Sequence, residues 1–172
     1  MVALLLGVVV LPAARAAVPS PANKTIVFGR SIGAVKLGMP FDDAKTIWGT
    51  ADTCATTEAT RVPKNYCRWV NSEDGGSLTI TAASTAAGAK VAEITLIVGI
   101  NPDSGAPVYT GAGLAFKTKD GFGIGAKEKA LKKAYPKVKD EFSNTLVLKA
   151  AKSVTHFSRF KGRITQVDIV VR

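Results

Sequence analysis

Two cysteines and one histidine are the residues of this chain best suited to metal binding or nucleophilic chemistry: Cys54, Cys67 and His156. A structural zinc ion takes about four protein ligands, and the histidine lies far along the chain from both cysteines, so the spacing argues against a metal site. In an oxidising compartment two cysteines are expected to form one disulfide. His156 falls in a predicted strand, and no base–nucleophile pair can be built around it.

A glycine-rich stretch has a superficial likeness to a phosphate-binding loop. It runs Gly121-Phe-Gly-Ile-Gly-Ala-Lys127, but it breaks the required spacing and has no Ser or Thr after the lysine. The carboxylates are scattered and form neither an acid–base pair nor a calcium loop. The chain is therefore expected not to be an enzyme and to need no metal or cofactor.

These residues belong to a basic chain of 172 residues, 47% of which are hydrophobic. Such a composition predicts a folded chain whose helices and strands position the side chains. That length suits one compact domain or two small ones. The formal net charge of +10 is unevenly spread, because residues 112–172 hold 14 basic and 5 acidic residues whereas residues 17–111 hold 8 of each. Six lysines lie in or just after a predicted helix: Lys127, Lys129, Lys132, Lys133, Lys137 and Lys139. This basic patch is either a solvated face or a surface for an anionic partner.

The N-terminus predicts export. Residues 2–14 are apolar but fall short of the roughly 20 residues that a transmembrane helix needs, and Ala14-Arg15-Ala16 has the small–x–small pattern of a leader-peptidase site. Residues 1–16 are thus expected to be a signal peptide. A buried N-terminal helix is the alternative, against which Pro12 and the alanines argue. No other stretch is long and apolar enough to span a bilayer.

Two parts of the chain share one pattern. Residues 35–49 align with residues 122–136, so that Gly38 falls on Gly125. Each segment predicts a short helix with an apolar stripe. Farther along, residues 92–98 align with residues 165–171, and their period of two places three apolar side chains of each on one sheet face.

Further strands are predicted at residues 66–70, 77–82, 145–149 and 154–160, with hairpin turns at residues 71–76 and 161–162. The pattern indicates an α+β fold in which a short helical segment and an antiparallel β-meander occur twice, with the two sheets joined into one surface that can be concave. The expected boundaries are an N-terminal tail over 17–25, a disulfide-bearing first repeat over 26–100, a linker over 101–115 and a basic second repeat over 116–172.

The order of features in the first repeat resembles the secreted β-lactamase inhibitory protein (BLIP) family. Gly38-Met39, a helix ending at Gly49, Cys54, and then Cys67-Arg68 followed by a hairpin match one repeat of that family over about residues 35–76. The resemblance implies tandem helix-plus-four-strand repeats whose sheets combine into a concave binding surface. The Gly-Met-helix-Gly opening is also similar to small outer-membrane assembly lipoproteins, which share the repeat shape but not this function.

The resemblance also implies a role for the first hairpin. In the inhibitor family an acidic residue there enters the active site of the target enzyme, and counting from Cys67 the matching position is Asp74, between Glu73 and Gly75. Gly75 and Gly76 stand where the family has aromatic residues, which removes side chains that usually carry binding energy. The alternative interpretation of Glu73-Asp74 is a solvated turn.

Together these features predict a secreted, non-enzymatic protein-binding module whose partner is an extracellular protein, such as a β-lactamase or another hydrolase. The alternative is a cell-envelope-associated binder of polyanions, either wall polymers or anionic lipid, that uses the basic second repeat. Nucleic acid is not expected as a partner, because the sequence has no aromatic-interleaved recognition signature.

Overall fold

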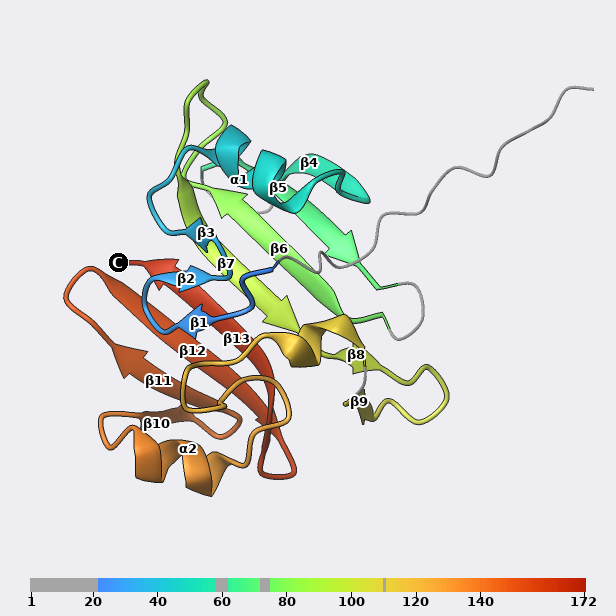
Figure 1. Cartoon of the computed structure of the whole chain (residues 1–172), viewed down its shortest axis with the longest axis vertical. Coiled ribbons are helices and arrows are strands. Elements are labelled where there is room, and N and C mark those ends of the chain that lie inside the picture. Colours follow the sequence, from blue (N-terminus) through green and yellow to red (C-terminus); the bar gives the residue numbers. More distant parts are fainter. Residues whose placement is uncertain (1–21, 58–61, 72–74, 110) are drawn as a thin grey trace, which may run out of the picture.

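An eight-stranded antiparallel sheet forms the centre of the computed structural model, which describes residues 22–57, 62–71, 75–109 and 111–172 (Figure 1). The strand order is β10-β11-β12-β13-β7-β6-β5-β4, so two four-stranded meanders meet where β13 pairs with β7. With only two α-helices beside this sheet, the protein is α+β, as predicted. The predicted signal peptide lies outside the described residues, as does the start of the predicted tail.

The strands of the large sheet have the following bounds. The first meander contains β4 (Thr53–Thr57), β5 (Lys64–Val70), β6 (Ser77–Ala82) and β7 (Val91–Ile97). The second contains β10 (Lys139–Phe142), β11 (Thr145–Lys149), β12 (Ser153–Phe160) and β13 (Arg163–Val171). The predicted strands at 77–82 and 145–149 are confirmed at both ends.

The remaining elements cover one face of this sheet (Figure 1). They are β1 (Ile26–Val27), β2 (Ser31–Ile32) and β3 (Val35–Lys36), which form a three-stranded sheet, the helices α1 (Phe41–Trp48) and α2 (Glu128–Ala134), and the 3₁₀ helix η1 (Ala112–Ala115). The predicted linker is partly ordered, since β8 (Gly99–Ile100) pairs with β9 (Pro107–Val108) just before η1. Among the described residues, no helix is long and apolar enough to cross a membrane.

Local sequence sets both ends of α1. Pro40 is the N-cap residue, and Asp42 and Asp43 stand in the first turn, where the positive end of the helix dipole favours carboxylates. The helix ends at Gly49, whose φ of 76° suits a residue without a Cβ atom. The N–H of Gly49 donates a 2.8 Å hydrogen bond to the carbonyl of Lys45.

The chain entering α1 is tied to the start of β7. Gly38 N–H donates to the Val91 carbonyl at 2.8 Å, and Val91 N–H donates back to Met39 at 2.9 Å. Phe41 N–H donates to Ala89, also at 2.9 Å. These bonds fix the helix against the last strand of its own meander.

The chain entering α2 makes the same three bonds to the start of β13. Gly125 N–H donates to the Ile164 carbonyl at 2.8 Å, Ile164 N–H donates to Ala126 at 2.9 Å, and Glu128 N–H donates to Gly162 at 2.9 Å. The positions that the sequence alignment equates therefore make equivalent contacts.

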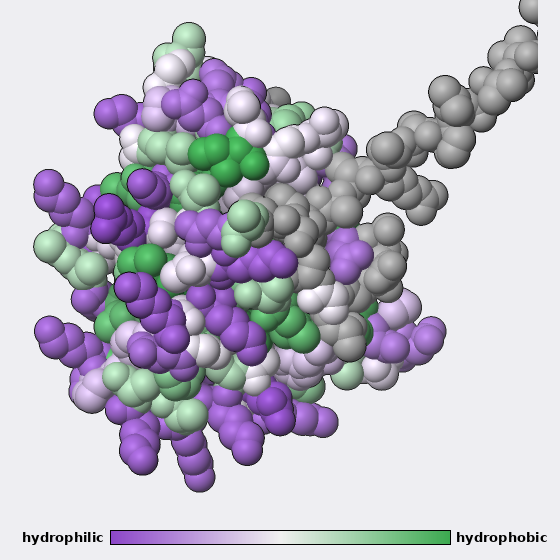
Figure 2. All heavy atoms as spheres, viewed as in Figure 1, coloured by the Kyte–Doolittle hydropathy of each residue, from purple (hydrophilic) through white to green (hydrophobic). Residues whose placement is uncertain are grey.

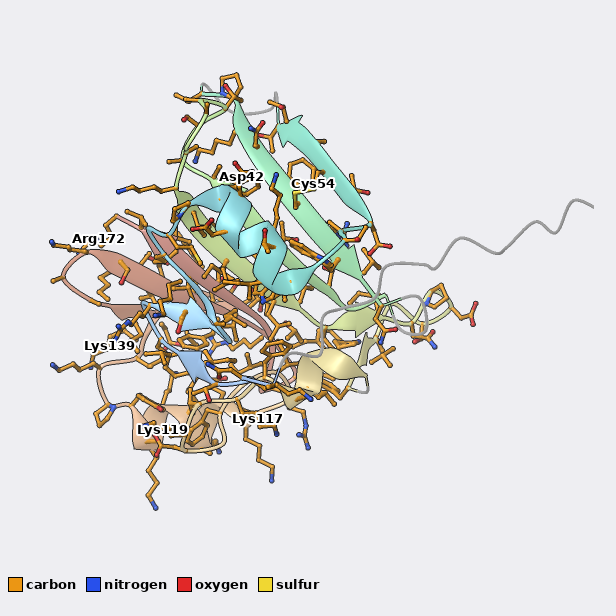
Figure 3. The ribbon with its side chains drawn as sticks, turned by 45° about the horizontal axis from the view of Figure 1, so that its top comes forward. Asp42, Cys54, Lys117, Lys119, Lys139 and Arg172 are labelled. Carbon is orange, nitrogen blue, oxygen red and sulfur yellow. A yellow bond between two sulfur atoms is a disulfide. The ribbon has the colours of Figure 1, made fainter. Side chains whose placement is uncertain are left out.

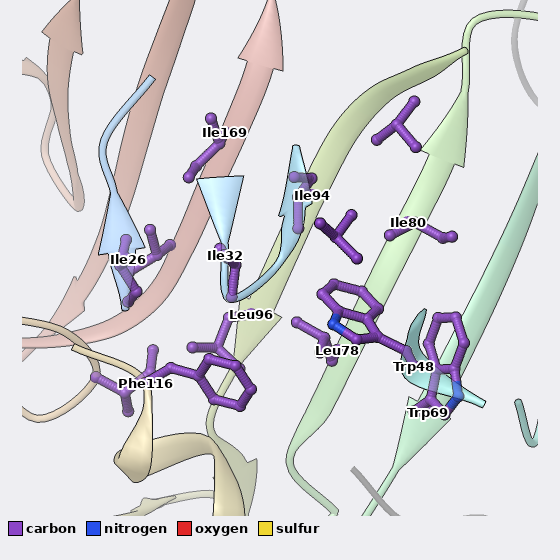
Figure 4. Close-up of a cluster of buried hydrophobic side chains, with 14 of the residues drawn as sticks. Ile26, Ile32, Trp48, Trp69, Leu78, Ile80, Ile94, Leu96, Phe116 and Ile169 are labelled. Atoms are coloured by element: carbon purple, nitrogen blue, oxygen red, sulfur yellow. The ribbon is translucent and has the colours of Figure 1, made fainter. Parts of the chain in front are cut away.

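The core lies between the covered face of the large sheet and these elements (Figure 4). Cross-strand pairs at the junction, Ile94 with Ile169 and Leu96 with Val167, bring apolar side chains of both meanders together. Under α1, Trp48 packs edge-on against Trp69 with ring centroids 5.2 Å apart. The apolar stripe of α2 is narrower than predicted, since Leu131 is the one buried residue of this helix.

Candidate functional site

The large sheet has a second face that does not contribute to the core. Side chains alternate along a strand, so Ile94 and Leu96 of β7 point into the core while Glu93, Thr95 and Ile97 point the other way. We call this second side the open face. On the five strands β5, β6, β7, β13 and β12 it carries Tyr66, Arg68, Thr79, Thr81, Glu93, Thr95, Ile97, Gln166, Asp168, Val170, His156 and Ser158.

The centre of the open face lies where the two meanders join. Thr95 and Asp168 are direct cross-strand partners, and the Thr95 hydroxyl donates a 2.5 Å hydrogen bond to Asp168 Oδ1. Gln166 Nε2 donates to the other carboxylate oxygen at 2.6 Å. The Asp168 carboxylate is therefore held from both sides and points in a defined direction.

Glu93 is a second carboxylate at this centre. Burial raises the pKa of the Glu93 carboxyl, and the neighbouring charge of Asp168 raises it further, while Lys64, Thr95 and His156 lower it. Two carboxylates that share a partly buried site repel each other, so this part of the face favours either a proton or a cationic group.

His156 also stands on the open face, directly across from Asp168 on the neighbouring strand. Its Nδ1 lies 3.1 Å from Glu141 Oε2, and its side chain is one-third exposed. Within the described ranges, no group of histidine, cysteine, aspartate and glutamate side chains is arranged to hold a metal ion.

The predicted partner-binding hairpin joins β5 to β6. Its two strands remain paired as far as Val70 and Ser77. Beyond them, Asn71 N–H donates a hydrogen bond to the Gly76 carbonyl at 2.7 Å, and Gly75 N–H donates to the Asn71 carbonyl at 2.8 Å. Gly75 is exposed and has a φ of 71°. Glu73 and Asp74, the acidic residues of this hairpin, lie outside the described residues.

The predicted disulfide is confirmed. Cys54 of β4 and Cys67 of β5 are cross-strand partners with a sulfur–sulfur distance of 2.03 Å. The bridge attaches the outermost strand to the sheet, on the covered side near Asp42 of α1 (Figure 3). Cys67 is buried and Cys54 is exposed.

The predicted basic patch divides into lysines with and without partners. Lys132 Nζ lies 2.8 Å from Glu128 and 2.9 Å from Asp140, and its hydrogen bonds to these carboxylates raise the pKa of the ammonium group. The same contact with Lys132 lowers the pKa of Asp140. Arg159 also binds both carboxylates. Lys132 is therefore part of a paired network and is not available to an anion.

The other lysines of the patch point to different places. Lys127 and Lys129 line a groove of about 310 Å³ together with Lys161 and Arg163 of the β12–β13 hairpin. A second groove, of about 220 Å³, is lined by Lys137 and Lys139 of the patch and by Lys149. Lys133 is exposed and lines neither groove. Figure 2 shows hydrophilic side chains gathered over the part of the covered side where α2 lies.

The polar residues at the centre of the open face were not predicted from the sequence. A usable signal was present, because the same period of two that placed apolar residues on one face places Glu93, Thr95, Gln166 and Asp168 on the other. That period does not predict which strands lie next to each other in the sheet.

Comparison of the chain with protein-family models, with curated proteins and with solved structures finds no match. The function is therefore inferred from the open face and the basic grooves.

Proposed function

We propose that this chain is a secreted binding module that acts without catalysis and engages another extracellular protein through its open face. The observation that carries the proposal is a sheet with one face committed to the core and the other carrying partly exposed side chains from both meanders. A surface of this kind offers many weak contacts over a wide area, which is how proteins recognise proteins.

We further infer that the two meanders with their helices are two copies of one unit. The equivalent hydrogen bonds at Gly38 and Gly125 support this, as does the junction: the pair Ile94–Ile169 and the pair Leu96–Val167 exchange places when the two copies are interchanged. A duplicated unit joined in this way builds the open face from two related halves.

The chemistry of the open face suits a protein partner with mixed polar groups. Thr79 and Thr81 of β6 present partly exposed hydroxyls that both donate and accept hydrogen bonds. Arg68 on one side and the Glu93–Asp168 centre offer both signs of charge, which favours one docking register over others.

The proposed target is an extracellular hydrolase, with a β-lactamase as the first candidate, and Asp74 of the hairpin is the residue proposed to enter its active site. The test is a competition assay in which micromolar protein is added to a panel of secreted hydrolases. Inhibition of a β-lactamase that is lost with Asp74→Ala supports the proposal. Unchanged activity across the panel removes the inhibitor function.

Use of the open face is tested separately with Thr79→Arg, which places a bulky cation in the middle of that face. Thr46→Arg is the matched control, because Thr46 is an exposed residue of α1 on the covered side. Binding to the target should fall with Thr79→Arg and stay at the wild-type level with Thr46→Arg. Equal binding by both variants would show that the open face is not the contact surface.

The second candidate function is binding of an anionic envelope polymer or lipid through the groove that contains Lys127 and Lys129. The observation in its favour is that neither lysine has an ion-pair partner in the described part of the chain. Retention on cell-wall material should fall steeply with salt and should fall with Lys127→Glu plus Lys129→Glu. The control, Lys36→Glu plus Lys90→Glu, makes the same charge change at exposed lysines of the first half. Retention that ignores salt excludes this function.

A further inference from the structure

A groove of about 510 Å³ lies on the covered side between the turn that follows β1, the loop at residues 118–120 and the end of α2. Its apolar lining includes Val27, Phe28 and Leu148. Val27 is 42% exposed although the adjoining Ile26 is fully buried. The volume falls in the range of about 300–1,000 Å³ that is typical of small-molecule sites.

The aromatic wall of the groove is held in place by its neighbours. The ring of Phe28 packs edge-on against Tyr135 at 5.1 Å and against Phe157 at 4.9 Å. The Tyr135 hydroxyl donates a 2.8 Å hydrogen bond to Asp120 Oδ2. The wall is therefore already formed before any ligand arrives, which reduces the entropy cost of binding.

The loop that forms the other side is fixed to the N-terminal strands. Ile26 N–H donates to the Lys117 carbonyl at 2.8 Å, and Lys117 N–H donates to Lys24 at 3.0 Å. Within the loop, Thr118 N–H donates to Phe122 at 2.7 Å. The groove is thus bounded by hydrogen-bonded backbone on both sides.

Two cationic side chains, Arg30 and Lys119, line the same groove. Both are exposed, and within the described ranges neither makes an ion pair or a side-chain hydrogen bond. Asp120 is the carboxylate of this groove, and its Oδ2 already accepts a hydrogen bond from Tyr135. The groove therefore combines an apolar lining with a net charge of +1, since Arg30 and Lys119 outnumber Asp120.

We propose that this groove binds a free fatty acid, with the acyl chain along Val27, Phe28 and Leu148 and the carboxylate on Arg30 and Lys119. Each buried methylene group contributes to binding through the hydrophobic effect, and an arginine–carboxylate contact supplies two charge-assisted hydrogen bonds. The proposal is independent of protein binding by the open face, because the groove lies on the covered side of the large sheet.

The test is calorimetric titration of the whole protein with monomeric dodecanoate. We expect saturable binding at one site, and at least tenfold weaker binding of dodecyltrimethylammonium, which has the same chain length and the opposite charge. Arg30→Gln plus Lys119→Gln should weaken dodecanoate binding at least tenfold. Lys117→Gln is a single-charge control, because Lys117 is an exposed lysine that does not line the groove; Figure 3 labels it together with Lys119.

A second variant tests the apolar part of the groove. Val27→Asp places a carboxylate at an exposed position, where the fold tolerates it, and should abolish dodecanoate binding. Absence of saturable binding by the wild-type protein would overturn the proposal, and so would equal affinity of the double variant and the Lys117→Gln control. Binding only to phosphatidylglycerol vesicles, with none to monomeric dodecanoate, would also overturn it and indicate a membrane surface as the partner.

Discussion

Glu93 is partly buried at the centre of the open face, and the surroundings raise the pKa of its carboxyl. The titratable side chains that act on it come from three other strands: Asp168 on β13, Lys64 on β5 and His156 on β12. Because burial is the largest cause, ionising this carboxyl costs more in the folded protein than in the unfolded chain.

Replacing this carboxyl with an amide should stabilise the protein in a pH-dependent way. A raised pKa means that the folded state binds the proton more tightly than the unfolded state, so the free energy of unfolding falls as the pH rises through the folded-state pKa. We expect Glu93→Gln to be more stable than wild type at neutral pH and equal to it below the usual pKa of a glutamate. Urea denaturation over a pH series measures this, with Asp103→Asn, an exposed linker residue, as the control. A difference between Glu93→Gln and wild type that stays constant over pH would contradict the assignment.

Two glycines are required for different physical reasons, and alanine substitution separates them. Gly38 has a φ of 80°, and a Cβ atom added there would meet no heavy atom within 4 Å, so Gly38→Ala should cost about 1–2 kcal/mol from backbone conformation alone. At Gly123 a Cβ atom would lie 2.3 Å from the Phe116 carbonyl oxygen, so the backbone itself would have to move. Denaturant titration should therefore show the larger loss of stability for Gly123→Ala. The reverse order would contradict the close approach of these two segments.

At the scale of elements, β4 is the strand that depends most on a covalent link. It is the outer strand of the sheet, its side chains are almost all exposed, and its neighbour in the sheet is β5. The Cys54–Cys67 bond therefore supplies an attachment that packing does not.

Removal of the disulfide should destabilise the protein and loosen β4. A bridge with a sequence separation of 13 stabilises by about 3 kcal/mol in the chain-entropy model. We expect Cys54→Ser plus Cys67→Ser to lower the free energy of unfolding by about that amount. Amide hydrogen exchange should rise in β4 while β12 and β13, in the other half of the sheet, keep their protection. Increased exchange spread evenly over all strands would mean that the bridge acts on the whole fold.

The helix α2 shows why a charge pattern does not identify a binding surface. The lysines of residues 127–139 look alike in sequence, yet Lys132 is paired with Glu128 on its own helix and with Asp140 on β10. The first partner, four residues away on a helix, was accessible to a sequence argument. The second requires the turn that brings β10 back beside α2, which sequence patterns do not specify.

At the scale of the whole molecule, the two meanders share one sheet and one core. The buried residues of both halves form a single cluster, and Ile169 of the second half pairs directly with Ile94 of the first. Cooperative unfolding of the two halves is the expected consequence.

Truncation of a core residue in one half should also destabilise the other half. Ile169→Ala should cost about 2–5 kcal/mol, and Val171→Ala, at a position 45% exposed on the same strand, is the control. The two tryptophans, Trp48 and Trp69, both lie in the first half, so their fluorescence reports on that half alone. We expect the fluorescence midpoint to fall together with the midpoint measured by far-UV circular dichroism. Separate midpoints would show that the halves unfold independently.

The elements that local chemistry specifies were predictable. The apolar stripe in residues 35–49 and the stop at Gly49 predicted α1, and the strands predicted at residues 77–82 and 145–149 have the observed bounds, because such signals act over a few residues. The three-stranded sheet β1–β3 was not predicted, because strands of two residues are too short to show a period.

What the sequence by itself determined is both α-helices, six strands of the large sheet (β5, β6, β7, β11, β12 and β13), the disulfide partners and the uneven distribution of charge, all of which depend on residue types and short spacings. The tertiary structure decided which face of the sheet is covered, that Thr95 meets Asp168 at the junction, and that Arg30 and Lys119 line one apolar groove. The physical reason is that these juxtapositions join residues far apart in the chain, and they are selected by packing of the whole core. No local propensity encodes them.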